Sequence, residues 1–181
     1  MTTWIALLRG INVSGRRKVP MADLRALHEG LGHRDVVTYL QSGNVVFDAE
    51  TDAATLPTAL EGAIADTFGF DVPVVVRTID ELRAAASANP YPGQGADPKH
   101  VATAFLAAAP VPERIDGFDP DAYGPDVCVL AGCEVHLHCP SGFGRTKLTT
   151  TYLERQLGVV ATVRNWRTLS ALVELGDREQ P

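Results

Sequence analysis

Basic side chains gather in two short segments of this 181-residue chain, and they are the groups best suited to chemistry. Residues 1–22 contain four bases and no acid, and residues 145–167 contain five bases and one acid. Together these 45 residues carry a formal charge of +8, whereas the other 136 carry −14. Guanidinium and ammonium groups beside backbone N–H groups favour phosphate and carboxylate ligands. The pattern predicts a site for a small phosphorylated or otherwise anionic ligand.

Each basic segment contains a glycine-bearing loop ahead of a predicted helix. Gly10–Gly15 has the spacing of a nucleotide-binding phosphate loop, but Arg16 and Arg17 follow it, so no hydroxyl is placed to hold magnesium. Gly142–Lys147 could wrap an anion with its amides. We expect the two segments to meet in one anion site. The candidate ligand-binding residues are Arg9, Asn12, Arg16, Lys18, Asn44, Arg145, Lys147 and Arg167.

Two alternatives stay open for these loops. They could be solvated basic turns that pair with local acids, because charge segregation often serves only solubility and docking. The protein could also be an enzyme acting on a phosphorylated small molecule. The chain has no HExxH, GxSxG, GxGxxG or paired CxxC motif, so no catalytic residue is assigned and the sequence does not decide whether it is an enzyme.

No cofactor and no metal site are predicted. His136 and His138 are two apart on a predicted strand and point the same way, but the alternation turns Val135, Leu137 and Cys139 to the opposite, core-facing side. Three cysteines are an odd number, typical of reduced thiols, and Cys133 is expected on the core side too. His28 and His33 are expected at the surface.

Composition is that of an ordinary globular protein, with 45% hydrophobic residues, 21% charged residues and a mean hydropathy of +0.01. No apolar run of about 18 residues predicts a membrane span, and we expect a cytoplasmic protein without a membrane partner. The net charge of −6 and the few aromatic residues disfavour a nucleic-acid partner. A single-stranded nucleic-acid-binding or protein-interaction module remains an alternative, and the sequence leaves the oligomeric state open.

Hydrophobic periodicity predicts the order β-α-β-β-α-β twice, with a further helix after each set. Short turns around Gly43 and Gly132 join the central pairs of strands. This order predicts an α+β fold of two ferredoxin-like repeats, closely associated or intertwined. The Pro- and Gly-rich segment 89–98 suggests domains at 1–92 and 93–181, the second with a C-terminal helix. The predicted strands are 3–9, 36–41, 45–48, 72–77, 101–106, 127–130, 134–138 and 159–163.

Six motifs resemble those of the bacterial domain of unknown function 1697 family. They are Leu7–Val13, Lys18–Arg25, Thr38–Phe47, Asn89–Pro92, Gly144–Leu148 and Thr162–Arg167. The resemblance covers nearly the whole chain and implies two intertwined ferredoxin-like domains. The resemblance does not indicate which activity to expect, and it assigns no catalytic residues. Ser14 and Gly15 stand where the family usually has two glycines, a change that should be tolerated.

Overall fold

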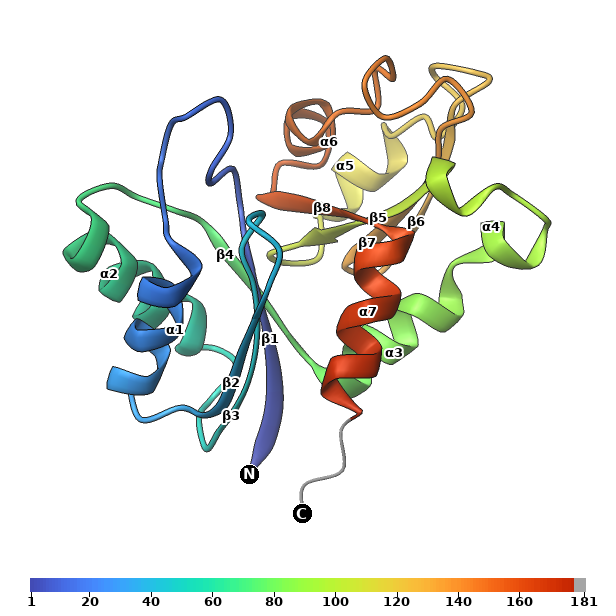
Figure 1. Ribbon diagram of the computed structural model, residues 1–181. Coiled ribbons are helices and arrows are strands. Elements are labelled where there is room, and N and C mark those ends of the chain that lie inside the picture. The colour runs from blue at the N-terminus through green and yellow to red at the C-terminus, as the bar shows by residue number, and fades with distance from the viewer. Residues whose placement is uncertain (178–181) are drawn as a thin grey trace. The chain divides into compact units, whose positions relative to one another are not determined.

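A computed structural model describes residues 1–177 (Figure 1). Within them the fold is mixed α+β, with two four-stranded antiparallel sheets and seven α-helices. The strands are β1 (Thr2–Leu8), β2 (Arg34–Tyr39), β3 (Asn44–Ala49), β4 (Val74–Thr78), β5 (Val101–Leu106), β6 (Val127–Ala131), β7 (Glu134–His138) and β8 (Ala161–Asn165). The helices are α1 (Met21–Gly30), α2 (Leu56–Phe68), α3 (Ile79–Ala88), α4 (Pro90–Gly93), α5 (Pro112–Asp116), α6 (Thr150–Leu157) and α7 (Trp166–Gly176).

Contacts divide the chain into two compact units. Unit 1 comprises Met1–Leu82 together with the chain from Leu172, and unit 2 comprises Arg83–Ala171. The change from one unit to the other falls inside α3 and again inside α7. The Pro- and Gly-rich segment that follows α3 forms α4 and a 3-10 turn, Pro98–His100.

The sheet of unit 1 has the order β2-β3-β1-β4. Strand alternation sends Trp4, Ala6 and Leu8 to one face, where they form a core with residues of α1 and α2. Leu24 of α1 and Leu60 of α2 are fully buried there. The other face carries Ile5 and Leu7, which are buried as well.

The sheet of unit 2 has the corresponding order β6-β7-β5-β8. Its core contains Ala104 and Leu106 of β5 with Leu153 and Leu157 of α6. Val135, Leu137 and Cys139 lie on this core face, as the alternation along β7 predicts. The expectation for Cys133 is wrong: this residue lies in the β6–β7 turn and is half-exposed.

The predicted strands are all present, and their ends differ by up to two residues. The second strand runs over Arg34–Tyr39 rather than 36–41, because Leu40 takes a left-handed conformation (φ 58°) and ends it. The last strand begins at Ala161, because Gly158 ends α6 in a left-handed conformation and two further residues connect them. Within residues 1–177, no helix has both the length and the apolar character needed to span a membrane.

Candidate anion-binding loops

The loop between β1 and α1 is a tight, left-handed turn. An isolated bridge joins Val13 to Arg16, and the Arg16 N–H donates to the Val13 carbonyl over 3.0 Å. Three residues with side chains, Asn12, Ser14 and Arg17, have φ of 54°, 51° and 48°. Such conformations cost about 1–3 kcal/mol each and persist only where the surroundings impose them. The helix begins only at Met21, so the loop is not a nucleotide-type phosphate loop.

Asn12 holds this loop in place. Its Nδ2 donates to the carbonyls of Val19 (2.9 Å) and Gln41 (2.8 Å), and its Oδ1 accepts from the Val19 N–H (2.9 Å). Because Gln41 belongs to the β2–β3 turn, one amide joins two loops that are distant in sequence. The side chain of Asn12 therefore positions the loop.

Asn44, the first residue of β3, is fully buried. Its Nδ2 donates to the Tyr39 carbonyl over 2.6 Å and to Ser42 Oγ over 3.1 Å. These bonds close the β2–β3 turn on which Asn12 rests. Asn44 therefore stabilises the turn that Asn12 contacts, and it does not itself face a ligand.

The cations of this loop face solvent. Arg16, Arg17 and Lys18 are exposed, and among the described residues none of the three takes part in an ion pair. Arg17 lies over Gly10, with its Nη1 3.9 Å from the place a Cβ on Gly10 would take. A concavity of about 660 Å³ is lined by Gly10, Val13, Ser14, Arg16 and Arg17. Arg17 was not among the sequence candidates, although its type and neighbours could have indicated it.

The second loop, in unit 2, is also a tight turn. The N–H groups of Arg145 and Thr146 both donate to the Gly142 carbonyl over 3.0 Å, and Gly142 has φ 86°. Arg145 and Lys147 are exposed, and the Lys147 ammonium lies 5.6 Å from the centre of the Tyr123 ring. This contact is a cation–π interaction.

Arg167 lies in the first turn of α7 and is exposed. A cation at a helix N-terminus is unfavourable, because the helix dipole is positive there. A bound anion would offset that cost. The Asn165 side chain accepts from the Thr168 N–H over 2.8 Å and caps the same end.

The structure brings the site candidates together in two groups. Arg9, Asn12, Arg16 and Lys18 share one loop of unit 1, with Asn44 in the turn beneath it, whereas Arg145, Lys147 and Arg167 belong to unit 2. The convergence of the two basic segments stays a prediction.

One base counted in the second segment does not contribute to a surface. Arg164 in β8 is 6% exposed, and burial lowers the pKa of its guanidinium to about 10. It donates to Thr162 Oγ1 over 2.7 Å and to the Val163 carbonyl over 3.0 Å. Counting charge along the sequence cannot separate such an arginine from an exposed one.

The histidines show one clear error of sequence reasoning. His28, expected at the surface, is fully buried, and its Nδ1 lies 3.0 Å from Nδ1 of His33. Both rings contact Phe47, that of His33 stacked at 4.4 Å. Burial, with a smaller effect of His33, lowers the pKa of His28 to about 3. No group of three or more metal-ligating side chains occurs among residues 1–177.

These observations define an α+β protein of two units, each of which presents an exposed basic loop. The chain belongs to the family described as protein of unknown function (DUF1697), whose model matches residues 1–136. No curated protein matches it. Its fold is similar to that of the conserved bacterial protein SP0830 from Streptococcus pneumoniae, with a TM-score of 0.77 and 21% identity, over 97% of this chain and 99% of that one.

Proposed function

We propose that the protein binds a small phosphorylated or otherwise anionic ligand at the loop Gly10–Lys18, and that each unit is a ferredoxin-like repeat that carries one basic loop. The observation that supports this proposal most directly is the cluster of Arg16, Arg17 and Lys18. All three are exposed, and among the described residues none takes part in an ion pair. Like charges held this close repel one another, and an anion relieves that repulsion. The alternative of pairing with local acids predicts salt bridges at these side chains.

The loop is held in one shape before any ligand arrives. The side-chain hydrogen bonds of Asn12 and the buried Asn44 hold the left-handed turn. A loop ordered in advance loses less conformational entropy on binding, which favours affinity for a small ligand. Asn12 and Asn44 act here as positioning residues, and the exposed cations contact the ligand.

A small ligand fits better than a nucleic acid. Binding of single strands needs aromatic faces that are open for stacking. In unit 2 the half-buried aromatic pair Tyr123 and Tyr152 is packed edge to face, with Lys147 over one ring and Arg155 over the other. The net charge of −6 also opposes a polyanion.

Thermal melting with inorganic phosphate, pyrophosphate, nucleotides and sugar phosphates tests this proposal. We expect a rise in Tm of several degrees with at least one of them, lost in the double variant Arg16→Gln, Lys18→Gln. The matched control is Arg25→Gln, which removes an exposed arginine of the same unit that pairs with Glu29 at 2.9 Å. Equal stabilisation of both variants, or none with any anion, would contradict the proposal. Turnover of the stabilising compound would make the protein an enzyme.

The role of the second loop is tested with the same compound. Lys147→Gln is combined with Lys18→Gln in a double-mutant cycle of ligand affinity. Effects of independent sites add within about 0.5 kcal/mol, whereas groups that contact one ligand couple more strongly. Coupling is expected if one ligand contacts both loops, and additivity would assign a separate anion to each.

A further inference from the structure

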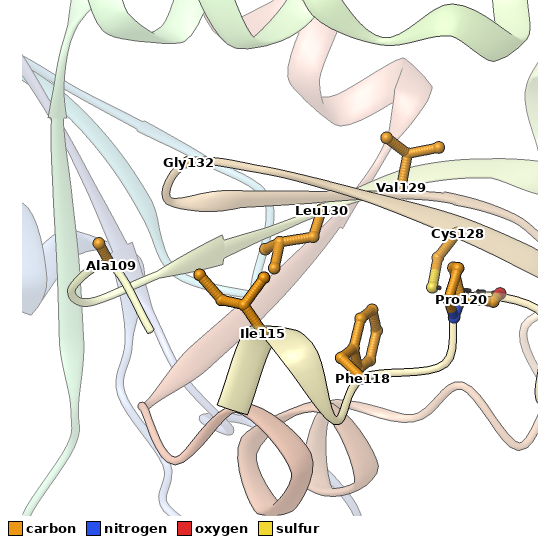
Figure 2. Close-up of a pocket in the computed structure, with 8 residues that line it drawn as sticks. All are labelled: Ala109, Ile115, Phe118, Pro120, Cys128, Val129, Leu130 and Gly132. Carbon is orange, nitrogen blue, oxygen red and sulfur yellow. Dashed lines mark hydrogen bonds between the residues drawn. The ribbon is translucent and has the colours of Figure 1, made fainter. Parts of the chain in front are cut away.

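Unit 2 contains an apolar groove unrelated to the basic loops. Ile115 and Phe118 face Cys128 and Leu130 of strand β6 across it, and Ala109 and Gly132 lie towards one end (Figure 2). Its volume is about 510 Å³, within the range of small-molecule sites. Ile115 is 44% exposed, which is high for an isoleucine. The helix beside the groove, α5, is only five residues long.

Acidic residues are adjacent in sequence to residues that line the groove. Asp119 lies between Phe118 and Pro120, both of which line the groove, and Asp116 follows directly after Ile115. Asp116, Asp119 and Asp121 are all exposed. Burial raises the pKa of the Cys128 thiol to about 12, with smaller effects of Cys139, Asp121 and Asp119.

The nearby cations are engaged elsewhere. Arg114, the one base in α5, donates through Nη1 to the Arg155 carbonyl over 3.3 Å and lies against Gly158 at the end of α6. Lys147 lies over Tyr123, and Arg155 over Tyr152. None of these bases lines the groove.

We infer that this groove binds a small apolar molecule that carries an ammonium group, with its hydrocarbon part between Ile115, Phe118 and Leu130 and its cation at Asp119. An apolar floor supplies affinity through burial of hydrocarbon, and the carboxylate selects the positive charge. The thiol of Cys128 takes no covalent part: it is protonated and directed at the Pro120 carbonyl, 3.6 Å away. The site is independent of the anion site and has the opposite charge preference.

Titration with octylammonium, octanol and octanoate, followed by calorimetry and by NMR shifts, tests the inference on the full chain. Octylammonium is expected to bind more tightly than octanol and at least ten-fold more tightly than octanoate. Ile115→Lys places a cation in the groove and should weaken octylammonium at least ten-fold. Asp119→Asn keeps the oxygen that accepts the Asp121 N–H but removes the charge. This variant should bind octylammonium several-fold more weakly.

The matched control is Val160→Lys, which converts another exposed apolar residue of unit 2 outside the groove and should leave binding unchanged. Equal binding of octanoate, undiminished binding in Ile115→Lys, or no binding of any probe would overturn the inference. Self-association that Ile115→Lys abolishes, without octylammonium binding, would make the groove an interface between copies and would overturn it too.

Discussion

Units 1 and 2 follow the same order of strands and helices, but the helices on their core faces differ in length. In unit 1, α1 has 10 residues and α2 has 13, whereas α5 and α6 of unit 2 have 5 and 8. The longer pair buries residues such as Leu24, Leu60 and Ile64 completely. The shorter pair leaves the groove beside β6 open. Two units with the same strand order therefore differ in the length of their core helices and in the surface beside them.

The last strands of the two sheets share a buried arginine. Arg77 is the fourth residue of β4 and Arg164 the fourth of β8, and both are buried. Arg77 is opposite Ile5 on β1, but Arg164 is opposite Thr103 on β5. The row in unit 2 continues from Thr103 to His136, whose Nδ1 lies 3.2 Å from the Thr103 hydroxyl.

Three buried polar residues are hydrogen-bonded in unit 2. Asn89 Nδ2 donates to Thr103 Oγ1 over 3.3 Å, and the Thr103 hydroxyl is hydrogen-bonded to His136 Nδ1. His136 Nε2 is buried and has no partner among the described residues. Burial lowers the pKa of His136, consistent with a neutral ring. The position opposite the buried arginine is therefore aliphatic in unit 1, where it is Ile5, and part of a polar network in unit 2, where it is Thr103.

The largest expected effect is a loss of stability on replacing a hairpin glycine by alanine, and it should differ between the two units. Gly43 has φ 81°, and a Cβ there would lie 2.6 Å from Ile11 Cδ1 and 2.8 Å from Leu8 Cβ. Gly43→Ala should destabilise the protein by about 3 kcal/mol in urea unfolding, since strain and overpacking add.

The control for this comparison is Gly132→Ala in the hairpin of unit 2. Gly132 has φ 62°, but among the described residues no atom beyond its chain neighbours lies within 4 Å of the place a Cβ would take. Only backbone strain of about 1 kcal/mol is therefore expected. Equal losses in the two variants would show that the crowding beneath Gly43 does not matter.

The second effect is acid sensitivity that originates in unit 1. The pKa of His28 is about 3 in the folded protein, below its ordinary value of 6.5, so the unfolded chain binds the proton first. Above pH 6.5, neutral His28 does not lower the free energy of unfolding. As the pH falls from 6.5 towards 3, the free energy of unfolding decreases by up to about 1.4 kcal/mol per pH unit.

Urea unfolding at pH 7 and pH 5 measures this loss. Proton uptake by His28 on unfolding should account for a decrease of about 2 kcal/mol in the free energy of unfolding between these two pH values. His28→Leu should reduce the difference, whereas the half-buried His138→Gln in unit 2 should retain it. An unchanged pH dependence in His28→Leu would refute the assignment.

The smallest effect concerns the end of α6. Arg114 donates to the Arg155 carbonyl at the C-terminus of that helix, where the dipole favours a cation. Arg114→Ala should cost about 0.5 kcal/mol in thermal unfolding, and Arg114→Lys less. A loss above about 2 kcal/mol would mean that α5 depends on this contact for its position.

The sequence by itself determined the order of elements, the core face of β7 and the concentration of bases in two loops. These follow from periodicity and composition, which are local properties. It also placed Arg16 and Lys18 correctly in a loop, where both are exposed.

Only the tertiary structure decided which polar residues face solvent and which support the fold. His28, Arg164 and Asn44 are polar by type, yet each is buried. His28 packs against Phe47, a residue of another element, whereas Asn44 and Arg164 bond to residues at most five positions away. Asn12 reaches Gln41 across 29 residues. The groove beside Ile115 depends equally on the distance between a short helix and a strand, and such long-range packing leaves no periodic signal in the chain.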